Sequence, residues 1–242
     1  YCLLPTVNCN AQQYNFRNYN VQDGLIQSQV NCIIQDSRGY LWIGTWGGLS
    51  RFDGKKFKNY TTADGLPHAM IYDMLEDDWG NIWLTTRKGA AVFDGKKFTT
   101  YTTDEGLVSN YVNKLFQDSK GNIWLLSKGK GISVMENGRW MMDDGKEEYN
   151  SVRFTNYTDE LGLKHYWFSS IMEDSQGNIW IGTGIYHASE AGKEEGIVVF
   201  DPSWIKKRSN GASGNKFKNY ATKDGLISNY INDIIEDNNG NI

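Results

Sequence analysis

The side chains best suited to recognition chemistry are cationic, aromatic and imidazole groups that lie in glycine-rich loops. Arg87 could bind a carboxylate or sulfate group through its forked guanidinium, with Lys88 beside it. Trp46 and Tyr186 could stack on the apolar face of a sugar ring. The remaining candidates are Lys128, His68, the run His165-Tyr166-Trp167, and His187. These residue types favour binding of a ligand that carries both sugar rings and acidic groups.

The same residues do not form a recognisable catalytic group. Glycosidase chemistry needs two carboxylates across the scissile bond, or a tyrosine nucleophile with an arginine cluster. Arginine is scarce among the candidate loops, and most carboxylates belong to repeated turns. The three histidines are dispersed, no Ser-His-Asp order is recoverable, and the run Asp237-Asn238-Asn239-Gly240 lacks the distal glutamate of a calcium loop. We therefore predict no catalytic residue, metal or cofactor.

The candidate loops are separated by a phrase that recurs five times, in which an acidic turn precedes a glycine and a tryptophan. Its aspartates are at positions 36, 77, 118, 174 and 237, which gives steps of 41, 41, 56 and 63 residues. A Gly-Leu pair stands 12 residues before each aspartate. The repeated residues are Asp36, Gly39 and Trp42; Asp77, Gly80 and Trp83; Asp118, Gly121 and Trp124; and Asp174, Gly177 and Trp180. A period near 40 residues indicates a repeat architecture.

Each repeat contains four short β-rich runs bounded by Asp, Gly and Asn, as expected for strands joined by hairpins. Four-stranded antiparallel sheets repeated around an axis are the blades of a β-propeller. We therefore predict an all-β propeller with four complete blades and one partial blade. The predicted repeats within residues 12–242 are about 24–64, 65–105, 106–161, 162–224 and 225–242.

The repeated residues have predicted structural roles. We expect each tryptophan to lie in the core between neighbouring sheets, each aspartate to accept hydrogen bonds from turn amides, and each glycine to adopt a positive φ. The run Phe16-Arg17-Asn18-Tyr19 matches a fourth strand, and the fifth repeat stops one residue before its expected Trp. We interpret the chain as a fragment of a larger propeller, with an orphan strand at each end.

Residues 1–11 are similar to the tail of an export signal, with Gln12 as the expected mature start. Beyond that cut only Cys32 remains, so no disulfide within the chain is expected, and Cys32 is interpreted as a small buried side chain. No transmembrane segment is predicted. The net charge of −4, without a basic stripe, argues against a nucleic-acid partner. Export from the cytoplasm is therefore the favoured interpretation.

With the repeats defined, the pattern resembles the two-component regulator propeller family. Trp42-Ile43-Gly44-Thr45 and Trp180-Ile181-Gly182-Thr183 match the core of its repeat, whereas Trp83-Leu84-Thr85-Thr86 and Trp124-Leu125-Leu126-Ser127 are drifted copies. The resemblance implies the periplasmic sensor region of a hybrid histidine kinase of Bacteroidetes. Such proteins typically carry seven-bladed propellers, a β-sandwich domain, one inner-membrane span and cytoplasmic kinase modules, and respond to oligosaccharides. No catalytic domain of that kind is expected in this chain.

In a propeller, the repeated Asp–Gly turns between the first and second strands lie on one face. The Gly-Leu loops before the first strands, and the tips that join the second strands to the third, lie on the other face. We therefore expect the ligand candidates to share the variable face. The run 136–153 and the run 202–216 are insertions on the opposite rim, and Trp140, Met141 and Met142 are expected to contact a partner. The expected partners are an oligosaccharide, the remaining propeller and β-sandwich domains, and a second copy of the chain.

Two other functions remain open at this point. The run Asp174-Ser175-Gln176-Gly177-Asn178-Ile179-Trp180 is similar to the Asp-box turn of sialidase-like propellers, which keeps a glycosidase or lyase as one alternative. A propeller that only binds other proteins is the second alternative.

Overall fold

The computed structural model describes residues 16–136, 153–158, 167–184, 196–201 and 217–242. These residues form four antiparallel sheets of four strands, and in each sheet the strands lie side by side in chain order. Blade 1 contains β1 (Val30–Gln35), β2 (Leu41–Thr45), β3 (Leu49–Phe52) and β4 (Phe57–Tyr60). Blade 2 contains β5 (Ile71–Glu76), β6 (Ile82–Thr86), β7 (Gly89–Phe93) and β8 (Phe98–Tyr101).

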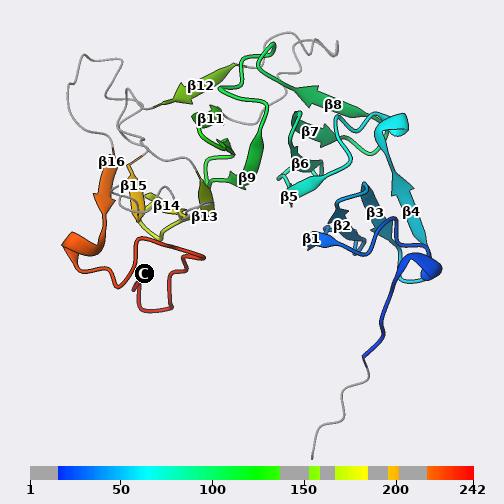
Figure 1. The fold of residues 1–242 in the computed structure, drawn as a ribbon, viewed down its shortest axis with the longest axis horizontal. Coiled ribbons are helices and arrows are strands. Elements are labelled where there is room, and N and C mark those ends of the chain that lie inside the picture. The colour runs from blue at the N-terminus through cyan, green and yellow to red at the C-terminus, as the bar shows by residue number, and fades with distance from the viewer. Residues whose placement is uncertain (1–15, 137–152, 159–166, 185–195, 202–216) are drawn as a thin grey trace, which may run out of the picture.

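Blade 3 contains β9 (Val112–Gln117), β10 (Ile123–Ser127), β11 (Gly131–Met135) and β12 (Phe154–Tyr157). Blade 4 contains β13 (Phe168–Glu173), β14 (Ile179–Thr183), β15 (Ile197–Phe200) and β16 (Phe217–Tyr220). The four blades form an open arc, with β1, β5, β9 and β13 on its inner side and β4, β8, β12 and β16 outside (Figure 1). Consecutive inner strands contact one another. The propeller fold predicted from the repeats is confirmed.

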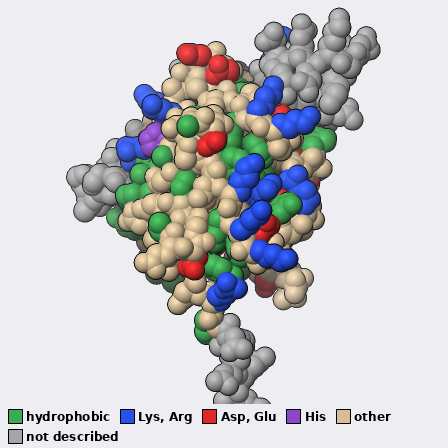
Figure 2. All heavy atoms as spheres, turned by 90° about the vertical axis from the view of Figure 1, so that its right-hand side faces the viewer, with side chains coloured by type: hydrophobic (Ala, Val, Ile, Leu, Met, Phe, Trp, Pro, Cys, Tyr) green, Lys and Arg blue, Asp and Glu red, His purple; other side chains and the backbone are tan. Residues whose placement is uncertain are grey.

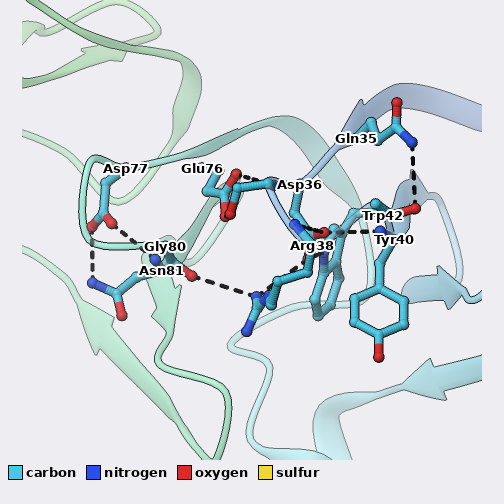
Figure 3. A network of polar contacts seen from close by, with 11 residues as sticks. Gln35, Asp36, Arg38, Tyr40, Trp42, Glu76, Asp77, Gly80 and Asn81 are labelled. Carbon is cyan, nitrogen blue, oxygen red and sulfur yellow. Dashed lines mark hydrogen bonds and ion pairs between the residues drawn. The ribbon is translucent and has the colours of Figure 1, made fainter.

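The repeated aspartate organises each turn between the first and second strands. Asp36 Oδ1 accepts hydrogen bonds from the backbone N of Arg38 at 3.0 Å and of Tyr40 at 2.8 Å. Its Oδ2 accepts one from Trp42 Nε1 at 2.9 Å, and Figure 3 shows this carboxylate between the turn and the indole. Gly39 supports the turn with a φ of 86°. The aspartate and glycine roles predicted from the sequence are therefore confirmed.

The repeated tryptophans form the core, as predicted. Trp42, Trp83 and Trp124 are completely buried. Trp42 stacks on Tyr60 of its own blade and meets Phe93 of blade 2 edge-on, with ring centroids 5.9 and 5.7 Å apart. Because Trp42, Trp83 and Trp124 each lie in a cluster with side chains of the next blade, they hold neighbouring blades together. Trp180 departs from the prediction, since it is only partly buried and stacks on Tyr220 of its own blade.

The loops that enter the blades are also held by repeated polar contacts. In blade 1, Ser50 Oγ accepts a hydrogen bond from Ile26 N at 3.1 Å and donates to Asn59 Oδ1 at 2.6 Å. Asn59 Nδ2 in turn donates to Gly24 O at 2.9 Å. Blade 3 repeats this arrangement with Ser133 and Asn156. The Gly-Leu loop is thereby fixed on its own blade, which gives the variable face a rigid base.

The two ends of the described chain differ from complete blades. Residues 16–20 and 230–236 belong to no strand of the four sheets. Tyr19 nevertheless packs on Phe52 and Phe57, at centroid distances of 4.9 and 5.7 Å, much as Tyr60 packs on Phe93 and Phe98. At the other end, Ile231 N donates to Thr183 O at 3.0 Å. The strands predicted at the two ends are therefore not formed, although Tyr19 and Ile231 make contacts that match those of their repeats.

Candidate ligand-binding site

The tips that follow the second strands are tied to the loops that precede the first strands. Trp46 N donates to Gln29 O at 3.2 Å, and Lys128 N donates to Tyr111 O at 2.9 Å. In blade 4, Gly184 N donates to Trp167 O at 3.0 Å in the same way. The tips and loops predicted to share the variable face therefore lie together at the inner rim, where the backbone sets their spacing.

Tyr111 is the centre of a cationic and aromatic cluster between blades 2 and 3. The Arg87 guanidinium carbon lies 5.2 Å from the centroid of the Tyr111 ring, and Lys128 Nζ lies 5.4 Å from it. Lys128 Nζ is also 4.7 Å from the ring of Trp167 on the next blade. Tyr72 stacks on Tyr111 at 5.4 Å, and its hydroxyl donates to the Tyr111 hydroxyl at 3.1 Å. We call these five residues the rim cluster.

The rim cluster carries positive charge. The ion pairs found among the described residues join Arg38 to Asp36 and Lys114 to Asp73, so they involve neither Arg87 nor Lys88. Arg87 and Lys88 are both exposed. Cations held over aromatic faces are already positioned, so an incoming anion has less side-chain motion to restrict.

The other predicted site residues lie in several environments. Trp46 is 49% exposed, and its indole N–H donates to Asn31 Oδ1 at 2.9 Å, which fixes the ring at the rim of blade 1. His68 Nδ1 accepts a hydrogen bond from Met70 N at 3.0 Å. Ser109 and Ser228 accept the same bond in their repeats, so this contact of His68 closes a turn. His165, Tyr186 and His187 lie outside the described residues, as do Trp140, Met141 and Met142.

Sequence reasoning missed Tyr72 and Tyr111 as site residues. Tyr111 lies five residues after the glycine of its Gly-Leu pair, and Trp167 and Tyr230 lie at the same distance after theirs. This repeated aromatic position could have identified Tyr111 as a site residue. Tyr72 lies within β5, and no repeated pattern marks it. Its place in the cluster depends on the contact between blades 2 and 3.

On the repeated-turn face, two of the repeated aspartates have lowered pKa values. Burial opposes ionisation of Asp36, but hydrogen bonds from Trp42 and Tyr40 and the nearby Arg38 outweigh it and hold the pKa below its ordinary value. The same balance holds the pKa of Asp174 low. These carboxylates are ionised acceptors that hold turns, and they are not poised to give or take a proton near neutral pH.

Two partly buried groups of the inner strands have raised pKa values. Burial raises the pKa of Asp73, against the opposing effect of Lys114, whose Nζ lies 3.5 Å away. Burial and the charge of Asp73 raise the pKa of Cys32 to about 12. Cys32 is therefore a protonated thiol at neutral pH. Its side chain is partly buried, whereas the sequence predicted a buried one. In the described part of the chain, no three His, Cys, Asp or Glu side chains are grouped to hold a metal.

A second positive surface lies on the outer side of the arc, where Lys and Arg side chains gather (Figure 2). A hollow at the β3–β4 hairpin is lined by Arg51, Asp53, Lys56, Phe57 and Lys58. Lys58 lies 5.0 Å from the ring of Tyr60. Blade 4 repeats that contact between Lys218 and Tyr220, so it belongs to the repeat and not to a particular site.

Comparison with known sequences and structures agrees with this architecture. The sequence profile described as "Two component regulator propeller" matches residues 24–47, 65–88, 106–129 and 162–184. A search of curated protein sequences found no match. No helix in the described part of the chain is long and apolar enough to cross a membrane.

Three similar crystal structures show the fold. The extracellular domain of the hybrid two-component system BT3049 from B. thetaiotaomicron is 24% identical, with a TM-score of 0.66 over 89% of this chain and 26% of that one. The corresponding domain of BT4673 from the same organism is 21% identical, with a TM-score of 0.66 over 88% of this chain and 28% of that one. A virginiamycin B lyase from Staphylococcus aureus is 15% identical, with a TM-score of 0.55 over 79% and 55%. This chain thus spans about a quarter of the length of the two-component domains.

Proposed function

The chain belongs to the two-component regulator propeller family, and from this we propose that it is part of the extracytoplasmic sensor of a two-component system. In this proposal the chain binds a glycan-derived oligosaccharide. Other domains of a longer protein pass the signal through a membrane to a histidine kinase. The chain itself binds and does not catalyse.

The observation that carries the ligand proposal is the rim cluster. Trp167 offers an aromatic ring that suits the apolar face of a sugar ring. The Tyr111 ring is already packed against Tyr72, Arg87 and Lys128, and it holds the two cations in place. Arg87 adds a forked donor group that suits a carboxylate or sulfate group. Because these groups come from separate blades of a rigid arc, they offer several contacts along an extended ligand. The preferred ligand is therefore an oligosaccharide with uronate or sulfate groups.

The test is a thermal-shift titration with uronic-acid, sulfated and neutral oligosaccharides of equal length. We expect the acidic sugars to raise the melting temperature and the neutral sugars to have a smaller effect. Arg87→Ala should weaken the acidic-sugar affinity by roughly 10–100-fold, the change expected for one charge-assisted hydrogen-bonded contact. Lys120→Ala is the matched control, because Lys120 is exposed on the repeated-turn face.

Other outcomes would reject the proposal in different ways. New reducing ends in the titration samples would favour a glycosidase, and a product with a new double bond would favour a lyase. Equal loss of affinity in Arg87→Ala and Lys120→Ala would show that the sugar binds by general charge and not at the rim cluster. No shift with any sugar, for the chain or for the longer protein, would favour a propeller that binds proteins.

A further inference from the structure

Blade 1 carries an arginine at a position where the other blades carry valine. Arg51 in β3 lies in register with Trp42, and the residues in the same register of blades 2, 3 and 4 are Val92, Val134 and Val199. Val92 and Val134 are 1% and 0% exposed and pack in clusters with side chains of the next blade. Arg51 therefore brings a charged, partly buried side chain to a position that the repeat fills with an apolar one.

Tyr40, which contacts Arg51, is a second departure of blade 1 from the repeat. The other repeats carry an asparagine there, whose Nδ2 donates to the repeated aspartate: Asn81, Asn122, Asn178 and Asn241. In blade 1 Arg38 makes that contact, with Nη2 3.2 Å from Asp36 Oδ2. Tyr40 instead packs on Arg51, whose guanidinium carbon lies 4.3 Å from the centroid of the Tyr40 ring and 5.7 Å from that of Trp42. Two departures from the repeat thus meet in one contact, which fixes the guanidinium.

The residue opposite Arg51 on the neighbouring strand is also a cation. Arg51 pairs in register with Lys58 of β4. The corresponding pairs of the other blades contain no more than one cation: Val92 with Thr99, Val134 with Thr155, and Val199 with Lys218. Like charges directly opposite each other destabilise a sheet. Blade 1 therefore has an unfavourable pair that an anion between the two cations would relieve.

Arg51 has no anionic partner in the described part of the chain. Neither of the ion pairs found there involves Arg51. Its Nε is buried and has no hydrogen-bond acceptor among the described residues. The acid that lines the same hollow, Asp53, accepts hydrogen bonds through Oδ1 from Lys55 N at 2.9 Å and Lys56 N at 2.8 Å, so it holds the hairpin. A buried N–H of a charged group without an acceptor costs free energy, which an added acceptor would recover.

We propose that the hollow at the β3–β4 hairpin binds a doubly charged oxyanion, a phosphate or sulfate group, held by Arg51, Lys56 and Lys58. The guanidinium of Arg51 offers parallel N–H groups that suit two oxygens of one oxyanion, and the lysines add point charges. Three cations and one carboxylate line the hollow, and this excess of two positive charges favours a dianion over a carboxylate group. The site lies on the outer side of the arc, separate from the rim cluster, and does not depend on the function proposed above.

The test is calorimetric titration of the chain with inorganic phosphate, sodium sulfate and sodium acetate at one ionic strength. We expect phosphate and sulfate to bind more tightly than acetate. Arg51→Val, which installs the residue of the other blades, should weaken phosphate binding by roughly 10–100-fold, the loss expected for one charge-assisted hydrogen-bonded contact. Arg51→Lys keeps the charge without the fork and should weaken it by about 10-fold. Lys55→Ala is the matched control, because Lys55 is an exposed cation of the same hairpin and does not line the hollow.

A second variant keeps the test decisive if Arg51→Val folds poorly. Lys58→Thr installs the residue of blades 2 and 3 at the exposed position opposite Arg51, and it should weaken phosphate binding by about 3–10-fold. Titration with glucose 6-phosphate and with glucose then identifies the source of the group. Tighter binding of glucose 6-phosphate than of inorganic phosphate would support a phosphorylated molecule as the ligand. Weaker binding would support the free ion.

Three results would overturn the proposal. No binding of phosphate or sulfate up to about 10 mM would show that the hollow is not an anion site. Equal losses of affinity in Arg51→Val and Lys55→Ala would show that the anion responds to the general charge of the hairpin. Acetate that binds as tightly as phosphate would contradict the preference for a doubly charged oxyanion.

Discussion

At the scale of single residues, the repeated aspartate accepts the hydrogen bonds that join each turn to the core tryptophan. Asp118 is 3% exposed, and it accepts hydrogen bonds from two turn amides, from Asn122 Nδ2 and from the indole of Trp124. A buried carboxylate is stable only when it is satisfied in this way. The repeat therefore requires aspartate and tryptophan together, six residues apart.

This predicts the effect of removing one indole donor. Trp124→Phe keeps a buried ring but takes away the hydrogen bond of 2.9 Å to Asp118 Oδ2. We expect a loss of about 1–3 kcal/mol in the free energy of unfolding, measured by urea titration. Trp79→Phe is the control, since Trp79 is 48% exposed, and its change should stay within about 0.5 kcal/mol. Equal losses in the two variants would refute the role of the indole hydrogen bond.

A second prediction at this scale concerns pH. Burial raises the pKa of Asp73 in the folded chain, so the folded state binds this proton more tightly than the unfolded state does. The contribution of Asp73 to stability is therefore present below its ordinary pKa of 3.8 and is lost as pH rises through the raised value. Asp73→Asn should be more stable than the original chain at neutral pH, with the difference shrinking toward pH 3.8. Urea titrations across this range measure it, and a less stable variant at neutral pH would show that pairing with Lys114 outweighs burial.

At the scale of elements, neighbouring blades meet closely where the second strand faces the next blade's first strand. Gly44 in β2 lies opposite Cys32 in β1 and beside Ile71 in β5. A Cβ at Gly44 would lie 2.5 Å from Cys32 Sγ and 2.8 Å from Ile71 Cγ2. Blade 4 repeats this arrangement with Gly182, where a Cβ would meet Ser170 and Ile231, whereas blade 2 carries Thr85 at this position.

Gly44→Ala should therefore destabilise the contact between blades 1 and 2. Overpacking of this kind costs about 1–3 kcal/mol in the free energy of unfolding. Adding Cys32→Ala should recover part of the loss, because the nearest clashing atom is the Cys32 sulfur. Urea titration of the two single variants and the double variant gives the coupling. A double variant whose loss equals the sum of the single losses would contradict this account.

At the scale of the whole molecule, the arc leaves apolar flanks open at both ends. Ile33 lies on the flank of blade 1, and Ile227 and Ile235 lie on the fifth repeat, at 104% and 73% exposed. Exposed apolar surface beside unpaired strands favours association.

The chain studied alone should therefore self-associate. We expect light scattering to find dimers or larger species, and Ile33→Lys to reduce them without lowering the melting temperature by more than about 2 °C. The substitution has little effect on folding because Ile33 is exposed within the single chain. Lys120→Ala, away from both flanks, should leave association unchanged. A compact monomer at all concentrations would rule out association through these flanks.

The sequence alone determined the repeat, the four strands of each blade and the roles of Asp36, Gly39, Trp42 and their copies. These features are local or periodic: a turn needs its aspartate and glycine within five residues, and a blade needs apolar residues at alternating positions. The sequence also placed Trp46, Arg87 and Lys128 on one face, because strand parity assigns every loop to one of two faces.

Only the tertiary structure decided how residues of different blades meet. Tyr72 and Tyr111 join Arg87 and Lys128 because blades 2 and 3 pack against each other. The hydrogen bonds between Asp78 and Gln117 depend on the same packing. Such contacts join residues about one repeat apart, and no turn or periodicity within either repeat specifies them. The physical reason is that the packing of whole sheets, and not the local chain, sets the distances between blades.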